Sequence, residues 1–154
     1  MRALVQRVSH ASVTVRGETI SAIDRGFLVF LGVASDDTTA LAERLASKVA
    51  ALRIFEDAEG KMNRALADVG GAVLCVSQFT LYGDVRRGNR PSFTGAANPE
   101  LGRELYDHFC RAIEAAGLRC ERGQFGAHME VALLNDGPVT LMIDTSDFER
   151  PRRA

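Results

Sequence analysis

The sequence predicts an α+β fold in which two main amphipathic helices pack against largely antiparallel, barrel-like sheets. Three observations lead to this prediction: a segment of strand-like alternation at 11–15, an apolar run at 26–33, and two segments with apolar residues at helical spacing. The chain has 154 residues, 46% of them hydrophobic, which suits one well-packed core. We expect a single domain over 1–146 and a flexible, polar, Arg-rich tail over 147–154.

The first part of the chain has the pattern of strands. Residues 2–8 alternate loosely and residues 11–15 alternate cleanly before a turn at Arg16-Gly17-Glu18, which predicts antiparallel strands. The run 26–33 is apolar throughout and is bounded by glycine. This pattern is typical of a strand that is buried on both faces at the centre of a sheet.

Apolar side chains recur at helical spacing in two later segments. The first extends from Thr38 to Leu52, with Asp36 or Asp37 as its expected N-cap. The second begins after Asn98-Pro99, a favourable N-cap and first-turn pair, and stops at Gly117. Both segments are long enough to cover one face of a sheet.

Short apolar segments predict the remaining strands, at 53–55, 73–76, 118–121 and 128–134. The segment Asn135-Asp136-Gly137-Pro138-Val139-Thr140 lies between two apolar runs and has the composition of a hairpin turn. Its proline is the exception, because proline cannot donate to a strand ladder and takes the cis form more readily than other residues.

Charge and cysteine content narrow the class of protein. Lys and Arg number 19 against 20 Asp and Glu, a formal charge of −1, so we expect no overall basic surface for DNA. The three cysteines are widely spaced, which predicts neither a disulfide framework nor a zinc site. No segment has the pattern of a signal peptide or membrane span. We expect a cytoplasmic protein without a metal or cofactor.

The segment Ser77-Gln78-Phe79-Thr80-Leu81 places polar groups at the end of the apolar run 73–76, where they need hydrogen-bond partners. Ser77 and Thr80 are candidate nucleophiles, but a hydroxyl needs an adjacent base, and the three histidines are isolated in the sequence. Main-chain N–H groups could instead stabilise an oxyanion. A strand end or loop cap would account for the same residues without any catalysis.

The long segment 83–99 contains Arg86, Arg87, Arg90 and Phe93. Basic side chains beside an aromatic ring suit contact with phosphates and an unstacked base. A solvated loop of the same composition is the alternative interpretation.

The segments Ser77–Leu81 and Asn135–Thr140 together resemble the two signature motifs of the D-aminoacyl-tRNA deacylases. The similarity extends to Gln6-Arg7-Val8, to residues 53–63 and to residues 87–93, so it covers nearly the whole chain. The resemblance implies a homodimer that hydrolyses the ester between a D-amino acid and the terminal adenosine of tRNA. Its partners would be aminoacyl-tRNA and a second copy of the chain.

The resemblance also assigns roles to individual residues. Ser77, Gln78, Phe79 and Thr80 would form the catalytic segment, with the amides of Phe79 and Thr80 holding the scissile carbonyl. Whether the Thr80 hydroxyl attacks or only positions water is left open, although the missing base favours the second role. The Gly137-Pro138 bond would be cis, in a loop inserted into the partner's site.

The loop containing Gly137 and Pro138 would exclude L-amino acids by clash, a filter that cannot reject glycine, so we expect glycyl-tRNA to be hydrolysed as well. Arg7 would brace this loop.

Phe125, Ala127 and Met129 would form the adenosine pocket, although ordinary core packing accounts for Phe125 and Met129 equally well. Two alternatives to the deacylase interpretation remain. The first is a non-catalytic RNA- or nucleotide-binding module that uses the loop 86–93, and the second is a generic esterase that uses Thr80 or Ser77.

Overall fold

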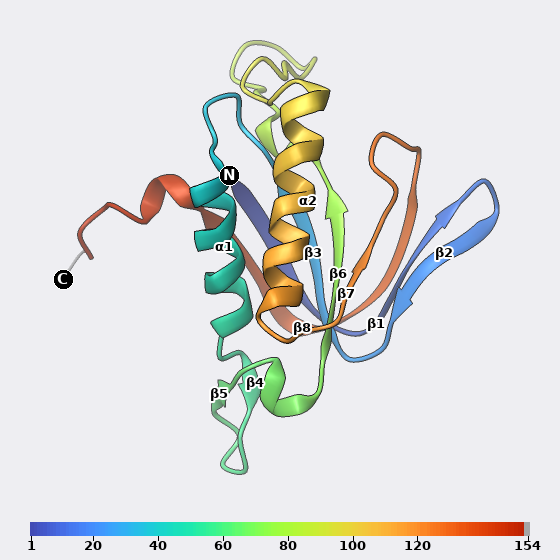
Figure 1. Ribbon diagram of the computed structural model, residues 1–154, viewed down its shortest axis with the longest axis vertical. Coiled ribbons are helices and arrows are strands. Elements are labelled where there is room, and N and C mark those ends of the chain that lie inside the picture. Colours follow the sequence, from blue (N-terminus) through green and yellow to red (C-terminus); the bar gives the residue numbers. More distant parts are fainter. Residues whose placement is uncertain (153–154) are drawn as a thin grey trace.

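The computed structural model describes residues 1–152 and has an α+β fold, with two helices on one face of a curved, barrel-like sheet (Figure 1). The strands of this sheet are β1 (Arg2–Val15), β2 (Glu18–Ile23), β3 (Gly26–Gly32), β6 (Ala72–Ser77), β7 (Cys120–Arg122) and β8 (Glu130–Asp144). The helices are α1 (Thr39–Ala51) and α2 (Pro99–Ala115). The smaller elements are β4 (Phe55–Glu56), β5 (Met62–Arg64) and the 3₁₀ turns η1 (Ala67–Val69), η2 (Phe79–Tyr82) and η3 (Thr145–Asp147).

Strand β1 organises the sheet. Its first half pairs antiparallel with β3, its second half pairs antiparallel with β2, and β8 runs antiparallel along its other edge. The sequence predicted separate strands at 2–8 and 11–15, but β1 is one continuous strand of 14 residues. The exposed residues Ser9 and His10 interrupt the apolar alternation without breaking the backbone.

The sheet is mixed, because β6 pairs in parallel with both β3 and β7. Parallel neighbours need a crossover connection, and α1 and α2 lie in the two connections that flank β6. The prediction of largely antiparallel sheet therefore holds around β1 and fails around β6. Local alternation patterns do not distinguish these two kinds of pairing.

Two apolar clusters fill the fold. The larger one lies between the helices and the sheet and includes Phe27, Leu45 and Phe109. The smaller one lies on the opposite face, where the curled sheet folds over Leu28 and Leu74. Because β3 contributes to both clusters and lies between β1 and β6, the prediction of a central strand buried on both faces is confirmed.

The predicted N-cap residue is correct for α2 and wrong for α1. Asn98 caps α2 as predicted, and its side chain accepts a hydrogen bond from the Leu101 N–H at 2.9 Å. The expectation of Asp36 or Asp37 at α1 is wrong, because the N-cap is Thr38. The Asp37 carboxylate instead accepts hydrogen bonds from the amino group of Met1, at 2.8 Å, and the Ala34 N–H, at 2.6 Å.

The predicted hairpin at 135–140 is also wrong. Strand β8 continues in one direction through this segment and pairs with β1 on both sides of it. Val8 pairs with Asn135 and Gln6 pairs with Thr140, so four residues of β8 lie opposite the single residue Arg7. The segment is a bulge, which the long partner strand allows because it offers pairing before and after the interruption.

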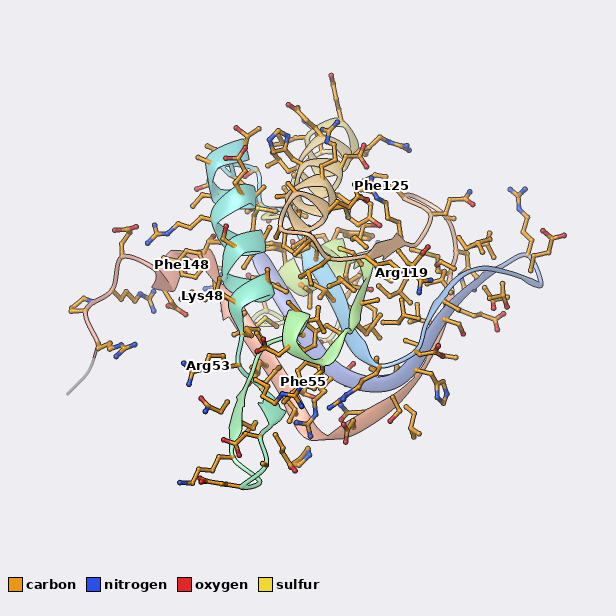
Figure 2. All side chains as sticks on the ribbon, turned by 60° about the horizontal axis from the view of Figure 1, so that its bottom comes forward. Lys48, Arg53, Phe55, Arg119, Phe125 and Phe148 are labelled. Atoms are coloured by element: carbon orange, nitrogen blue, oxygen red, sulfur yellow. The ribbon has the colours of Figure 1, made fainter. Side chains whose placement is uncertain are left out.

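The first residues of the predicted tail lie against α1. The Phe148 side chain packs on the main core, and the Arg44 guanidinium lies 4.8 Å from its ring centroid. Figure 2 shows Phe148 on the α1 side of the molecule and Phe125 on the α2 side. The end of the predicted tail, residues 153–154, lies outside the described residues. No helix within residues 1–152 is long and apolar enough to cross a membrane.

Candidate active site

The chain leaves the buried strand β6 at Ser77 and enters η2 directly. The backbone is fixed on both sides of this turn: the Gln78 N–H donates to the Leu31 carbonyl at 2.8 Å, and the Arg2 guanidinium donates to the Leu81 carbonyl at 2.8 Å. Arg2 also lies 4.5 Å from the centroid of the Tyr82 ring. No sequence pattern linked Arg2 to this turn, because the two lie far apart in the chain.

The N–H groups of Phe79 and Thr80 are free to bind a ligand. Each lies at the start of η2, where the first N–H groups of a helical turn have no acceptor within the helix. Neither donates a hydrogen bond to any other group in residues 1–152. Two neighbouring free N–H groups are the arrangement that holds a negatively charged oxygen.

The side chains of this turn do not form a nucleophile and base pair. The Thr80 hydroxyl accepts a hydrogen bond from the Gln78 side-chain amide, which cannot remove a proton at neutral pH. His108 pairs with Glu43 on the two helices, 3.1 Å away, and the exposed His10 and His128 lie in β1 and before β8. The arrangement therefore favours catalysis by main-chain donors over attack by an activated hydroxyl.

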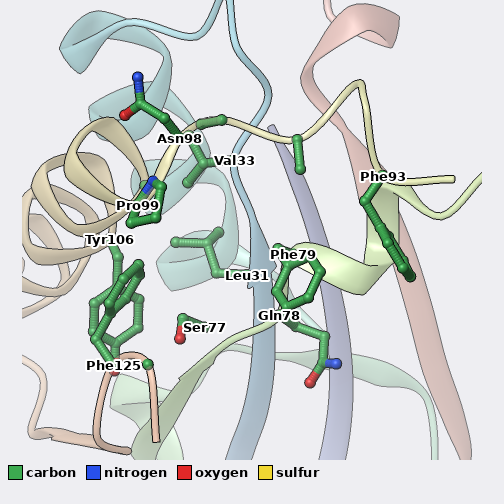
Figure 3. Close-up of a pocket in the computed structure, with 14 residues that line it drawn as sticks. Leu31, Val33, Ser77, Gln78, Phe79, Phe93, Asn98, Pro99, Tyr106 and Phe125 are labelled. Carbon is green, nitrogen blue, oxygen red and sulfur yellow. The ribbon is translucent and has the colours of Figure 1, made fainter.

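A cavity of about 360 Å³ opens beside η2. Figure 3 shows Phe79 on one side, Tyr106 and Phe125 on the other, and Ser77 between them. Its other lining residues are Leu31, Val33, Gln78, Phe93, Ala96, Ala97, Asn98, Pro99, Gly102 and Gly126. The walls are mainly aromatic and aliphatic, which suits a flat apolar group such as a nucleobase.

The wall residues supplied by α2 and the following loop are held in fixed positions. The Tyr106 hydroxyl donates to the Cys75 carbonyl at 2.7 Å, and burial raises the pKa of this phenol, so the side chain stays neutral. The Phe125 ring lies 6.0 Å from the Tyr106 ring and 4.9 Å from the Arg103 guanidinium. Tyr106 gave no sequence signal, because its spacing on the helix is that of a core residue.

Of the three residues assigned to an adenosine pocket, only Phe125 lines this cavity. Ala127 and Met129 pack against the smaller core cluster instead. The Met129 sulfur also accepts a hydrogen bond from the Gln124 N–H at 3.4 Å, which fixes the loop that carries Phe125. Their assignment to the pocket stays a prediction.

The bulge of β8 carries Gly137 and Pro138 at its exposed tip, and the peptide bond between them is cis. Arg7 holds the bulge from behind: its guanidinium donates to the Asp136 carbonyl at 3.2 Å and to the buried Ile54 carbonyl at 2.6 Å. Val139 is buried in the main core. The base of the bulge is therefore anchored, and its tip is exposed.

The two motif segments lie far apart within one subunit. The bulge lies opposite Arg7, which is level with Val73 of β6, and Ser77 lies four residues further along β6. This offset is about 13 Å along the strand, and the three strand spacings between β8 and β6 add about 14 Å across the sheet. In residues 1–152, Gly137 and Pro138 are not among the residues that line the cavity.

No group of three or more His, Cys, Asp or Glu side chains in residues 1–152 could hold a metal ion. The cavity walls likewise contain no carboxylate or imidazole. The chemistry available at this site is that of main-chain donors, hydroxyls and amides.

Comparisons with known proteins agree with this geometry. The family model of D-Tyr-tRNA(Tyr) deacylase matches residues 4–144. The D-aminoacyl-tRNA deacylase of Koribacter versatilis is 62% identical over 145 residues, covering 94% of this chain and 97% of that protein. The D-aminoacyl-tRNA deacylase of Chloroflexus aurantiacus is 57% identical over 154 residues, covering all of this chain and 96% of that protein.

Two solved structures share the fold. The structure titled c-Myc DNA Unwinding Element Binding Protein has a TM-score of 0.87 and 43% identity, covering 94% of this chain and 98% of that one. A structure titled as a probable eukaryotic D-amino acid tRNA deacylase has a TM-score of 0.80 and 21% identity, covering 92% of this chain and 97% of that one. The second likeness concerns the fold alone.

Proposed function

The chain belongs to the D-aminoacyl-tRNA deacylase family, whose members hydrolyse ester bonds, and from this premise we propose that it works as a cytoplasmic homodimer with sites shared between subunits. Each site would combine η2 and the cavity of one subunit with the β8 bulge of the other. The observation that carries the proposal is the pair of free N–H groups at Phe79 and Thr80, in a turn whose first residues line an apolar cavity without a side-chain base.

The chemical step needs only these main-chain donors and the substrate. Water attacks the ester carbonyl, and the N–H groups of Phe79 and Thr80 bind the oxyanion that forms. The carbon–oxygen bond to the ribose then breaks, and the ribose oxygen takes up the proton that the water releases. Free amino acid and tRNA are the products. The neighbouring ribose 2′-hydroxyl orients the water, because no side chain of the cavity can act as a general base.

Gly137 and Pro138 of the partner subunit would distinguish a D-amino acid from an L-amino acid on the substrate. Their two main-chain carbonyls would face the α-carbon and ammonium of the substrate on the side where an L side chain would project. Selection then works by steric exclusion. Glycine has no side chain to exclude, so glycyl-tRNA is also a substrate under this mechanism.

The exposed edge strand β8 supports the dimer. Three of its apolar side chains, Leu134, Leu141 and Met142, are 54%, 36% and 53% exposed. In residues 1–152 this strand pairs with β1 alone, so a 15-residue edge stays open. Long apolar edge strands are normally covered by another element or chain. A second copy of the chain would cover this edge and present the bulge at the same interface.

The terminal adenosine would occupy the cavity next to Phe125. Aromatic rings on two sides suit stacking of a base, which typically contributes about 1–3 kcal/mol. The ester would then lie at the Phe79 end of the cavity, beside the free N–H groups. This placement puts the scissile bond at the rim, where a loop from a second subunit can reach it.

The test compares hydrolysis of D- and L-aminoacyl-tRNA by the wild type and by Pro138→Ala. We expect the wild type to cleave the D-ester and spare the L-ester, and the variant to lose at least about tenfold in this discrimination. A D-ester without the ribose 2′-hydroxyl should bind without turnover. Unchanged stereoselectivity in the variant would remove the filter, and inertness of the wild type toward glycyl-tRNA would count heavily against exclusion.

A further inference from the structure

A basic loop formed by residues 84–92 joins η2 to the segment before α2, and it has a defined shape. Asp84 and Ser92 exchange two backbone hydrogen bonds, of 2.8 and 2.9 Å, that close the loop at its base. The tip between them is exposed throughout. The basic loop is therefore a closed projection on the surface rather than an irregular connection.

The basic loop is attached directly to the wall of the catalytic cavity. Phe93, the residue after the loop, lines the cavity and packs edge to face on Phe79, with ring centroids 5.1 Å apart. A second hollow, of about 430 Å³, is lined by Asp84, Arg86, Arg87 and Ser92. Ser92 lines the basic hollow and the next residue, Phe93, lines the apolar cavity, so the two sites are linked by consecutive residues of the chain.

The charges of the basic loop are only partly compensated. Arg86 forms an ion pair with Asp84, with an Nη2–Oδ2 distance of 2.6 Å, and the hydrogen bonds from Arg86 lower the pKa of Asp84 to about 2. Neither Arg87 nor Arg90 forms an ion pair with any carboxylate in residues 1–152. Two positive charges therefore remain on a chain of net charge −1, which favours an anionic partner.

We propose that Arg87 and Arg90 bind the phosphodiester backbone of the single-stranded tRNA end, immediately 5′ of the adenosine in the cavity. This inference rests on the proposed function, because it places the terminal nucleoside in the cavity that Phe93 also lines. A nucleoside held there must continue into its 5′-phosphate, and the basic hollow begins one residue before Phe93. Contacts to phosphate fix position without reading bases, so the loop would anchor the acceptor end independently of sequence.

The experiment uses two substrates that carry the same ester: a D-aminoacyl-tRNA and the corresponding 2′(3′)-O-D-aminoacyl-adenosine, which has no phosphate. The variant is Arg87→Ala with Arg90→Ala. We expect its kcat/KM on the tRNA substrate to fall about tenfold or more, mainly through KM. The slope of log(kcat/KM) against the logarithm of the salt concentration should become shallower by about 1.4, the value for two contacts to single-stranded phosphates. Hydrolysis of the adenosine ester should be unchanged.

The matched control is Lys48→Ala with Arg111→Ala, which removes the same charge from exposed positions on α1 and α2. It should leave both substrates unaffected. Equal losses on the two substrates by the loop variant would show that the loop acts through the shape of the cavity and would overturn the proposal. An unchanged KM and salt dependence on tRNA would do the same. If the wild type cleaves neither substrate, the proposed function itself fails, which is a separate outcome.

Discussion

The turn at the end of β6 and the bulge of β8 are held by the rest of the chain in opposite ways. The turn follows a fully buried strand, and its backbone is bonded to β3 and β1 through Leu31 and Arg2. The bulge interrupts an exposed edge strand, and it is anchored at its base by Arg7, Asn135 and Val139. One segment borders a cavity, and the other is exposed.

This difference indicates which part of a site each segment can supply. The turn presents two free N–H groups in a fixed position, which is the requirement for binding charge in a transition state. The bulge presents a rigid, small surface to whatever docks on the edge strand, which is the requirement for exclusion. Under the proposed function each segment would supply half of a site, so substitutions in the two segments should damage different halves.

The largest loss of activity is expected from Phe79→Pro, which removes one of the two N–H donors. Proline is tolerated at the first position of a helical turn, and Gln78 before it has φ −145° and ψ 76°, outside the α region that proline disfavours. We expect kcat to fall about 10²–10³-fold. Phe79→Leu is the matched control, because it removes the ring and keeps the N–H. Equal losses in both variants would show that the ring, not the donor, matters.

Gly137→Ala is expected to reduce deacylation about a hundredfold, because a methyl group at the tip would displace the substrate's α-carbon. Within its own subunit the added Cβ would lie 3.5 Å from the Asn135 Oδ1 atom, an ordinary contact, so folding stability should not fall. Thermal unfolding and single-turnover deacylation separate the two effects. Full activity in this variant would show that the bulge is not part of the site.

The two variants together test whether the halves come from different subunits. A dimer with Phe79→Pro in one chain and Gly137→Ala in the other can be purified with two different affinity tags. If sites are shared, one site carries both changes and the other carries none, so about half the wild-type activity remains. If each site lies within one chain, both sites are damaged and activity is lost.

The sequence predicted the local features of the turn after β6 and of the β8 bulge better than the position of these segments in the sheet. The polar end of the strand at 73–76 and the exceptional proline at 138 were visible as departures from ordinary patterns. The hairpin interpretation of 135–140 failed because Asn, Asp, Gly and Pro indicate a local change of direction, and not whether the strand then continues. Continuation was decided by β1, more than 120 residues away in the chain.

Features that depend on distant partners were not predictable. Thr38 caps α1 because the Asp37 carboxylate binds the amino group of Met1, a contact across 36 residues. Tyr106 and Leu31 line the cavity because α2 crosses over the end of β3, and both have the pattern of ordinary core residues. Periodicity identifies which residues are buried, but not which buried residues border a cavity.

A smaller loss of activity is expected from Arg7→Ala, which acts on the bulge from behind. Arg7 is 6% exposed, and its removal leaves the buried Ile54 carbonyl without its donor. We expect the free energy of unfolding to fall by about 1–3 kcal/mol, together with a loss of about tenfold in kcat/KM. Urea unfolding provides the first value. Arg7→Lys keeps the charge but cannot bond both carbonyls at once, so it should lie between the wild type and Arg7→Ala. An unchanged unfolding energy in Arg7→Ala would contradict the bracing role.

The smallest effect is expected from Thr80→Ala, which removes a hydroxyl from the turn and keeps its N–H. That hydroxyl accepts one exposed hydrogen bond from the Gln78 amide, so its loss should cost about 0.5–1.5 kcal/mol. We therefore expect single-turnover deacylation to slow by no more than about tenfold. A nucleophilic hydroxyl would behave differently, because its removal should abolish turnover by several orders of magnitude while binding is retained, and Thr80→Ser should restore it. A small, equal effect in both variants would leave the main-chain donors as the catalytic groups of this half of the site.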